Sequence, residues 1–474
     1  MKNDNNAGQT YDLAVIGAGS AAKAAATDAR LRGKSVIMVE RGAPGGTCLN
    51  VGCIPSKTLL AAAAVHATAQ RGGFPGIDTS AGPVDLSQLV KDKDRFIAER
   101  REEDHVKGTE QAGIDLLRGE ASFAPSVQDR LTLAVTGNGS AKVRITAEHV
   151  LIATGARPFI PDIPGLADVD YLTSSTAMSL DRVPESLLVI GGNAIGLEQA
   201  QFFARLGART TVVELAPRIA PFEDLAISAA LCQALTEEGI AFRTSAILTS
   251  VEPTDTGVLA TVTAGEDVFH LSAEKILIAT GRRPVTDGLN LAAVGVNVGP
   301  RGEVVVDEYL RTTHPHIWAA GDVTGHRQFV YVAGAQGATA VANAFGETAR
   351  SLDYTTVPRV TFTSPTLASV GLTPAEAEAA GQPYETRELP LAFVPRAVVS
   401  RHPHGVLKLV SDPETGRLLG VHMVGLEAGE VITAATYALS ARFTVQQLAT
   451  TWAPFLTMAE ALRMAAQMPA AATS

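Results

Sequence analysis

Apolar runs, glycine turns and an amphipathic stretch alternate in the same order at two places along the chain. Tyr11–Glu40 reads as an apolar strand, a glycine turn, an alanine-rich helix and a second apolar strand that ends in an acid. This order predicts a β-α-β unit. Ser186–Glu214 repeats it. Because the unit occurs twice, we expect two nucleotide-binding halves, which a single glycine-rich match would indicate only weakly.

Two shorter stretches also repeat, HVLIATGARP at His149–Pro158 and KILIATGRRP at Lys275–Pro284. Each predicts an apolar strand that leads into Thr-Gly, and together they bracket the second β-α-β unit. From about Val357 the pattern changes to strands separated by turns, with two helical stretches among them. We therefore expect an α/β fold with two Rossmann-like nucleotide-binding domains and a C-terminal α+β domain.

Length and composition agree with this organisation and narrow the function. The 474 residues suggest about three domains. The net charge of −10 argues against a surface for nucleic acid or for an anionic membrane. We find no apolar run of the length that a transmembrane helix needs, and the polar N-terminus has no secretory h-region. With only three cysteines, we expect a cytoplasmic protein without a disulfide scaffold.

The first β-α-β unit carries a dinucleotide fingerprint, Gly17-x-Gly19-x-x-Ala22. Gly17 permits the tight turn, Gly19 lets the backbone approach a pyrophosphate, and Ala22 allows close helix packing. The pyrophosphate is expected at the helix N-terminus, where free N–H groups favour an anion. Glu40, about 20 residues further on, is expected to accept hydrogen bonds from a ribose.

The second unit has Gly191 and Gly196, but Asn193 replaces the middle glycine of the fingerprint. An asparagine tolerates a left-handed backbone, although its side chain crowds the approach of a pyrophosphate. Glu214 closes the second strand and favours the free 2′-hydroxyl of NADH. Arg209 and Arg218 stand nearby in the sequence, and their positive charges would favour the 2′-phosphate of NADPH. NADH is favoured on balance, and NADPH stays open as the alternative.

Two of the three cysteines stand in the stretch GGTCLNVGCIPSK, as Cys48 and Cys53. In a straight helix, residues five apart rise by about 7.5 Å, more than the ~7 Å that a disulfide allows between Cα atoms. A Cys48–Cys53 bridge therefore needs an irregular helix start. Lys57 and a helix N-terminus would both favour a thiolate. A structural zinc site needs four ligands, and no second cysteine pair exists. Cys232, in a helical pattern, is expected to be an inert core thiol.

These motifs, taken in order, resemble those of the flavin-dependent disulfide reductases, the pyridine nucleotide-disulfide oxidoreductases. The resemblance runs from Tyr11 to Gln467 and includes Gly196–Glu198 and Trp318–Gly325. It implies a homodimer that uses FAD with NADH or NADPH. The implied domains are an FAD-binding domain at 1–155 and 285–352, an NAD(P)-binding domain at 156–284, a dimerisation domain at 353–468 and a disordered tail at 469–474.

The resemblance also implies roles for single residues. Cys48 and Cys53 are expected to form a redox-active disulfide that the flavin reduces, with Cys53 against the flavin and Cys48 attacking the acceptor. Lys57 and Glu198 are expected to form an ion pair near the flavin N5. Glu460 is the remaining acid of an acid–base pair. The expected cofactor-binding set consists of Gly17, Gly19, Ala22, Glu40, Gly42, Thr47, Lys57, Ala121, Gly155, Gly191, Gly196, Glu214, Gly281, Asp322 and Val330.

Within this group the mercuric reductase branch is the most similar, through Gly321–Gly337 and Phe455–Gln467. Three departures accompany this likeness. Phe455 replaces the histidine of thiol-reducing members and the tyrosine of mercuric reductase. The sequence ends in MPAAATS without the vicinal cysteine pair of that branch, and we expect no separate N-terminal metal-carrying domain. His105–Gly108 lacks a tyrosine that mercuric reductase carries there.

The departures bear on the electron acceptor. Reduction of a disulfide releases a thiolate, and a positioned acid speeds its protonation by about 10²–10⁴-fold. Phe455 cannot supply that acid. Reduction of Hg(II) needs two thiolates instead, and Hg(II) is soft and thiolate-seeking. We therefore expect Hg(II), bound by Cys48 and Cys53, as the acceptor. The alternatives are another metal or metalloid ion, a quinone, an unusual low-molecular-weight disulfide, or a flavoprotein that only sequesters metal.

Overall fold

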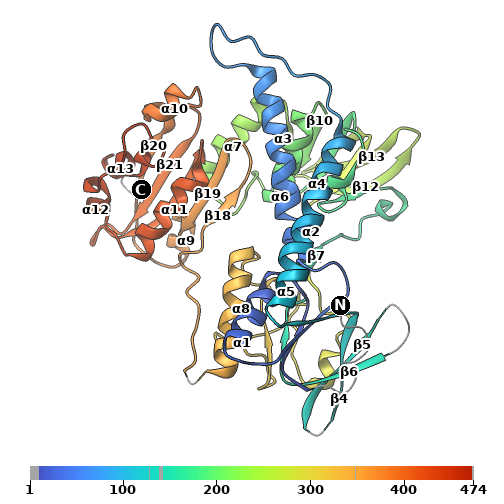
Figure 1. The fold of residues 1–474 in the computed structure, drawn as a ribbon. Coiled ribbons are helices and arrows are strands. Elements are labelled where there is room, and N and C mark those ends of the chain that lie inside the picture. The colour runs from blue at the N-terminus through green and yellow to red at the C-terminus, as the bar shows by residue number, and fades with distance from the viewer. Residues whose placement is uncertain (1–9, 128, 138–141, 347, 472–474) are drawn as a thin grey trace. The chain divides into compact units, whose positions relative to one another are not determined.

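The computed structural model describes residues 10–471 apart from 128, 138–141 and 347. The chain forms two compact units (Figure 1). Unit 1 consists of Met1–Pro55, Lys91–Phe159 and Gly281–Asp353. Unit 2 consists of Ser56–Val90, Ile160–Thr280 and Tyr354–Ser474. The expected tail lies partly outside the described residues, because 472–474 are not among them.

Unit 1 is built on a seven-stranded sheet with the order β3-β2-β1-β6-β5-β4, and β17 also pairs with β6. The pairs β1–β2, β2–β3, β1–β6 and β17–β6 are parallel, whereas β4–β5 and β5–β6 are antiparallel. Strands β7 and β16 form a separate two-stranded antiparallel sheet. The strands are β1 (Thr10–Ile16), β2 (Val36–Glu40), β3 (Asp115–Arg118), β4 (Glu120–Val127), β5 (Arg130–Thr136), β6 (Lys142–Ile152), β7 (Ala156–Pro158), β16 (Arg282–Pro284) and β17 (Ile317–Ala319).

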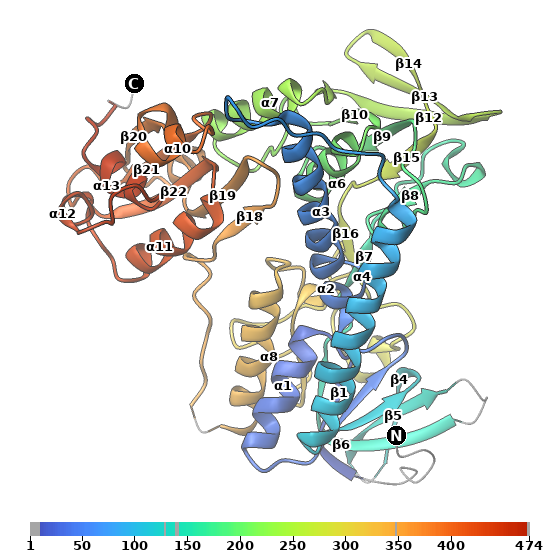
Figure 2. The same ribbon diagram turned by 45° about the horizontal axis from the view of Figure 1, so that its top comes forward.

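The alanine-rich helix α1 follows β1 and packs against α8 (Figures 1 and 2). Its buried residues are all alanines, which lets the two helices approach closely. A π-helical segment, η1, continues α4 without a break. The helical elements of unit 1, with α3 and α4 shared with unit 2, are α1 (Ser20–Leu31), α2 (Gly46–Asn50), α3 (Cys53–Arg71), α4 (Leu86–Arg100), η1 (Arg101–Lys107), α5 (Gly108–Gln111), η4 (Leu291–Val294), η5 (Asp322–Thr324) and α8 (Val330–Phe345).

Unit 2 contains a parallel five-stranded sheet with the order β11-β10-β9-β15-β8 and an antiparallel sheet β12-β13-β14. The predicted second β-α-β unit is β9, α6 and β10. The elements are η2 (Leu166–Asp168), β8 (Leu172–Thr173), η3 (Ala177–Ser179), β9 (Ser186–Ile190), α6 (Ala194–Arg205), β10 (Arg209–Val213), α7 (Leu225–Glu237), β11 (Ala241–Arg243), β12 (Ile247–Thr254), β13 (Gly257–Ala264), β14 (Asp267–Ala273) and β15 (Lys275–Ile278).

The C-terminal part of unit 2 is an antiparallel sheet, β18-β19-β22-β21-β20, whose strands β19 and β22 pack against α11. It confirms the expected α+β character, with more helices than the two helical stretches predicted from the sequence. The elements are β18 (Arg359–Thr361), β19 (Thr366–Gly371), α9 (Pro374–Ala379), β20 (Glu385–Pro390), η6 (Leu391–Phe393), α10 (Pro395–Val399), β21 (Val406–Ser411), β22 (Leu418–Gly425), α11 (Ala428–Ser440), α12 (Val445–Thr450) and α13 (Glu460–Ala466).

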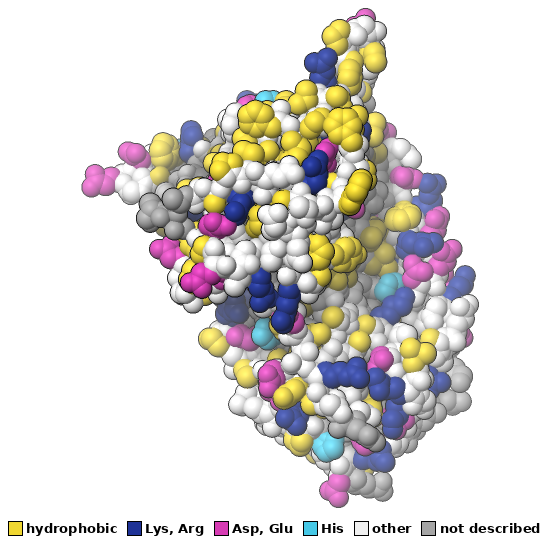
Figure 3. Space-filling model, turned by 90° about the vertical axis from the view of Figure 1, so that its left-hand side faces the viewer, with side chains coloured by type: hydrophobic (Ala, Val, Ile, Leu, Met, Phe, Trp, Pro, Cys, Tyr) yellow, Lys and Arg dark blue, Asp and Glu magenta, His cyan; other side chains and the backbone are white. Residues whose placement is uncertain are grey.

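Large hydrophobic side chains are exposed on this C-terminal part. Trp452 is 99% exposed, Tyr437 and Phe455 are each 71% exposed, and Phe393 is 65% exposed. Figure 3 looks onto the side of the molecule that carries α10 to α13 and shows hydrophobic side chains gathered at the surface. Exposed apolar clusters of this kind mark interaction surfaces in soluble proteins.

One stretch of the described residues, Gly46–Arg71, is long and apolar enough to cross a membrane by length and composition. It spans α2, a break at 51–52 and α3. Leu59 and Ala63 of α3 are buried in a core cluster of unit 2, and Lys57 of the same helix forms an ion pair. The core helix of a globular protein passes the same composition test, and 28% of this apolar window is buried.

Candidate redox and nucleotide-binding sites

The cysteine stretch has the irregular helix start that the spacing of its thiols requires. Cys48 lies in α2, Cys53 is the first residue of α3, and the backbone breaks between the two helices. Gly52 sits so close to the end of α2 that a Cβ there would lie 2.9 Å from the carbonyl oxygen of Thr47. Cys48 is half-buried and Cys53 is exposed. Cys53 therefore stands at the N-terminus of α3, where helix N–H groups have no partner within the helix.

Asn50 fixes this stretch, although sequence reasoning did not single it out. Its side-chain amide donates to the carbonyl oxygens of Ala43, Pro44 and Gly46 at 3.2, 3.0 and 2.9 Å. Its side-chain oxygen accepts from Nε of Arg101 at 2.7 Å. One asparagine thus binds two loop carbonyls and the first carbonyl of α2, and it ties α2 to η1, which holds Cys48 in a defined place. An asparagine between two cysteines gives no sequence signal of this role.

A mostly buried arginine completes the polar surroundings of the cysteine stretch in unit 1. Nη2 of Arg282 lies 3.4 Å from Oγ1 of Thr47 and 3.8 Å from a carboxylate oxygen of Asp322. It also donates to the carbonyl oxygen of Ala156. Burial lowers the pKa of Arg282, whereas the charges of Asp322 and Cys53 raise it. Burial raises the pKa of Asp322 and Arg282 opposes that rise.

The fingerprint of the first β-α-β unit packs closely against the loop before Cys48. Gly19 is the N-cap of α1, and its Cα would lie 2.7 Å from a Cβ at Gly46. The N–H of Gly45 donates to the carbonyl oxygen of Ala18 at 2.9 Å. No side chain therefore stands between the helix N-terminus and the loop before Cys48, so an anionic pyrophosphate has access to free N–H groups.

The remaining residues predicted to bind a cofactor in unit 1 lie around the same sheet. Glu40 is the last residue of β2 and accepts from Gly42. Ala22 and Ala121 are buried. Val330 begins α8, and the positive φ of Gly155 and Gly281 places each in a turn just before β7 and β16. Asp322, mostly buried with only Arg282 as an ionic partner in the described chain, suits the hydroxyls of a ribityl chain. The donor set fits FAD.

The fingerprint of the second unit has the same turn as the first. Gly17 and Gly191 share a φ of +114°, and a Cβ on either would lie 2.4 Å from the carbonyl oxygen of Ala153 or Ala279. The two repeated Ala-Thr-Gly stretches therefore pack beneath the two fingerprints. Asn193 has an extended backbone, with φ −105°. It needs no left-handed conformation, because the equivalent Gly19 is extended as well.

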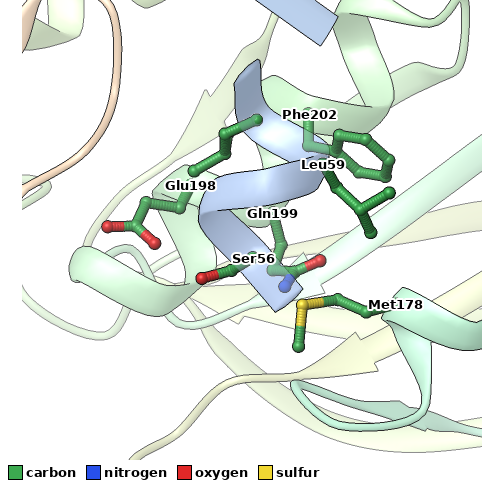
Figure 4. A pocket seen from close by; sticks show the side chains of 7 residues that line it. Ser56, Leu59, Met178, Glu198, Gln199 and Phe202 are labelled. Carbon is green, nitrogen blue, oxygen red and sulfur yellow. The ribbon is translucent and has the colours of Figure 1, made fainter. Parts of the chain in front are cut away.

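Lys57 and Glu198 form the ion pair that the resemblance implies. Nζ of Lys57 lies 2.8 Å from Oε2 of Glu198, and the ammonium sits 4.5 Å from the ring centre of Phe362. Oε1 of Glu198 accepts from the backbone N–H of Phe362 at 2.8 Å. Glu198 lines a pocket between α3 and α6, together with Ser56 and Gln199 (Figure 4). Both oxygens of Glu198 are thus held in place.

Helix α6 also binds the backbone of Ser364, two residues after Phe362 in the segment that follows β18. The side-chain amide of Gln201 accepts from the N–H of Ser364 at 2.8 Å and donates to its carbonyl oxygen at 2.7 Å. Arg205 donates to the same carbonyl oxygen at 3.0 Å. Glu198 and Gln201 therefore dock the backbone of residues 362–364 onto α6, a contact made to main-chain atoms that have no sequence signature.

The acid near the C-terminus, Glu460, is buried and forms an ion pair. Glu460 is 5% exposed, and its carboxylate lies 2.7 Å from the guanidinium of Arg463. It also accepts a long hydrogen bond, 3.4 Å, from the N–H of Leu456. Phe455 is exposed and offers no polar group. Cys232 is half-buried against a core cluster, and burial raises the pKa of its thiol, which favours the inert form.

Comparisons with known proteins agree with this architecture. Residues 11–337 match the family "Pyridine nucleotide-disulphide oxidoreductase", and residues 357–466 match its dimerisation domain. The mercuric reductase of Streptomyces lividans is 51% identical, with 96% of each chain covered. That of Staphylococcus aureus is 44% identical, over 98% of this chain and 83% of the relative.

Solved structures also resemble this chain. The flavoprotein disulfide reductase RclA of Escherichia coli, in a Cu(II) complex, has a TM-score of 0.85 at 29% identity and covers 97% of this chain and 99% of that one. LpdA of Mycobacterium tuberculosis has a TM-score of 0.86 at 29% identity, over 96% of this chain and 99% of that chain.

Proposed function

The chain belongs to the pyridine nucleotide-disulphide oxidoreductase family, and on that premise we propose that it is an enzyme that reduces Hg(II). In the overall reaction NAD(P)H gives up a hydride's two electrons and Hg(II) takes them, which yields NAD(P)⁺, a proton and Hg(0). The observation that carries the proposal is the pair Cys48 and Cys53 on either side of a helix break, in a chain that is 51% identical to a mercuric reductase.

FAD, when bound, supplies the two-electron chemistry that links the nicotinamide to the cysteine pair. Cys48 and Cys53 act as the thiolates that bind the soft Hg(II) ion. The positions of the two cysteines support different roles, with Cys53 against the flavin and Cys48 toward the acceptor. Cys53 begins α3, and Lys57 stands one turn later in the same helix. We propose that Lys57, which Glu198 orients at 2.8 Å, lies beside the flavin ring that Cys53 contacts.

The residues near the C-terminus favour a metal ion over a disulfide as the electron acceptor. Phe455 has no proton to give, and the carboxylate of Glu460 is occupied by Arg463 at 2.7 Å. A disulfide substrate would therefore leave its thiolate unprotonated, at a cost of about 10²–10⁴-fold in rate. Two-electron reduction of Hg(II) releases no basic leaving group and requires no acid at this place.

We further propose a cytoplasmic homodimer with the domain boundaries predicted from the sequence. The matched dimerisation domain and the exposed Phe393, Tyr437 and Trp452 support the pairing of two chains through this surface. Light scattering tests the dimer. A Trp452→Ser variant should lower the weight-average mass at micromolar concentration. Phe74→Ser, which alters a 49% exposed hydrophobic residue between α3 and α4, should leave it unchanged.

An acceptor panel tests the activity. NADH and NADPH oxidation are followed anaerobically with Hg(II) under excess thiol, with Cu(II), with glutathione disulfide, with lipoamide and with a soluble quinone. We expect turnover with Hg(II) that disappears in Cys48→Ala and persists in Cys232→Ser. Fast turnover with lipoamide would contradict the argument from Phe455. Binding of Hg(II) without nucleotide oxidation would indicate sequestration instead.

A further inference from the structure

The two repeated Ala-Thr-Gly stretches differ in the residue that follows them. Ala156 comes after the first and Arg282 after the second, and an arginine and a proline complete both stretches. Each stretch ends in a short strand, and these strands, β7 and β16, pair with one another. Because β7 forms with an alanine at this place, strand formation does not account for a mostly buried arginine in β16. A buried cation needs a compensating partner.

The two arginines of β16 lie on opposite sides of the strand. Cζ of Arg283 lies 4.1 Å from the ring centre of Phe159, and Arg283 is exposed. The side chain of Arg282 is only 13% exposed and lies against Thr47, the residue before Cys48. Neighbouring residues of a strand alternate between its faces in this way. Arg283 therefore provides a matched control for Arg282.

The contacts of Arg282 leave its positive charge only partly balanced. Nη2 donates to the carbonyl oxygen of Ala156 and lies 3.4 Å from Oγ1 of Thr47, and both acceptors are uncharged. The carboxylate of Asp322 is 3.8 Å away, which is beyond the length of a direct hydrogen bond. A second anion within reach of the guanidinium would therefore complete the balance.

Cys53 can supply that anion. Burial lowers the pKa of Arg282, and the negative charges of Asp322 and of Cys53 as a thiolate raise it. An electrostatic attraction acts on both partners, so the guanidinium also favours the thiolate of Cys53 over its thiol. Asp322 competes with Cys53 for the same guanidinium.

Two other cations belong to the cysteine stretch or contact it. Nζ of Lys57, in α3, lies 2.8 Å from the carboxylate of Glu198. Nε of Arg101, in η1, donates to the side chain of Asn50 in α2. The charge of Lys57 is thus compensated, and Arg101 acts on α2 rather than on the start of α3.

We infer that Arg282 is a positioning residue whose charge stabilises the thiolate of Cys53 in the reduced cysteine pair. The inference rests on the proposed function for the reduction of that pair. The two electrons and the proton of a hydride break the S–S bond and leave a thiol at Cys48 and a thiolate at Cys53. Arg282 supplies the counter-ion of this thiolate. An opposite charge at such a distance shifts a titration by about one to three pH units.

The test uses the FAD-loaded Cys48→Ala variant, in which Cys53 is the remaining thiol of the pair. One readout is the pH titration of the long-wavelength absorbance that a thiolate gives beside oxidised flavin. The other is the rate at which iodoacetamide alkylates Cys53 at each pH, measured by mass spectrometry, which requires no flavin signal. Only the thiolate reacts, so both readouts give the midpoint of the Cys53 titration.

Three variants in this background give different expected shifts. Arg282→Gln should raise the midpoint by about one to two pH units, so that alkylation below both midpoints slows about tenfold or more. Asp322→Asn should lower the midpoint, because it removes the anion that competes for the guanidinium. Arg283→Gln should leave the midpoint unchanged. A purely structural disturbance of the loop would move Arg282→Gln and Asp322→Asn in the same direction.

An unchanged or lower midpoint in Arg282→Gln overturns the inference, as does a rise in Asp322→Asn or an equal shift in Arg283→Gln. If Arg282→Gln does not fold, Arg282→Lys decides, since its retained charge should hold the midpoint within about half a pH unit of the parent and a larger rise refutes the inference. The predicted shifts without any reduction of Hg(II) would support this inference and contradict the proposed function. Reduction of Hg(II) without the shifts would do the reverse.

Discussion

Replacing Arg359 by methionine should destabilise unit 2 and loosen the residues that hold Glu198. Arg359 lies in β18, three residues before Phe362, and its Nε and Nη2 lie 3.0 and 3.1 Å from the two carboxylate oxygens of Glu223. Ser369 donates to the same carboxylate at 2.6 Å. Both charged side chains are at most 13% exposed. The bidentate pair anchors the strand whose end supplies the N–H that binds Glu198.

The size of the effect follows from burial. Burial raises the pKa of Glu223, but the hydrogen bond and charge of Arg359 outweigh it and hold that pKa below its usual value. Removal of one partner of a buried pair leaves an uncompensated charge and costs about 3–5 kcal/mol. At roughly 2 °C per kcal/mol for a unit of this size, the melting temperature should fall by about 6–10 °C.

The sign of the pH dependence gives a second test. In the wild type the lowered pKa of Glu223 makes a stabilising contribution that is present above its unfolded pKa and lost as the pH falls. In Arg359→Met the pKa of Glu223 should rise, so the variant should lose more stability at pH 8 than at pH 5.

Differential scanning fluorimetry at both pH values measures this. Arg311→Met, which removes an exposed pair with Asp307, is the control and should cost at most about 1 kcal/mol. The double variant Arg359→Met/Glu223→Gln should recover part of the loss, because the unpaired charge is gone. A loss in Arg359→Met no larger than in the control, or a double variant worse than both single ones, would refute the reasoning.

Three further predictions concern the site and its pH range. Glu198→Gln should keep FAD but slow flavin reduction by NADH about tenfold, because Lys57 loses its ionic partner; stopped-flow absorbance measures this, and an unchanged rate would contradict it. Gly46→Ala should reduce the FAD content of the purified protein severely, since the new Cβ would lie 2.7 Å from Cα of Gly19; the ratio of flavin to protein absorbance measures it. Burial lowers the pKa of His422, so stability should fall as the pH drops below about 6.5, by up to ~1.4 kcal/mol per unit, and less in His422→Gln in urea titrations.

The repeated motifs predicted much of the fold because they are local. Gly17 and Gly191 mark their turns in the sequence itself, and Ala153 and Ala279 precede the Thr-Gly dipeptides that pack beneath them. The break between Cys48 and Cys53 was likewise expected from geometry, since a straight helix holds those residues too far apart.

The contacts that hold the site were not predictable in the same way. The backbone of Phe362 and Ser364 binds Glu198 and Gln201 through main-chain atoms, which any residue could supply. Asn50 acts through loop carbonyls brought together only by the fold.

The central claim is that electrons reach Hg(II) through Cys48 and Cys53. Its most direct test is a single turnover without free nucleotide. The FAD-loaded protein is reduced anaerobically with two electrons, mixed with one equivalent of Hg(II), and assayed for volatile Hg(0). We predict close to one Hg(0) per active site in the wild type and in Cys232→Ser, and almost none in Cys48→Ala or Cys53→Ser. Equal release of Hg(0) from the wild type and the two cysteine variants would contradict the account.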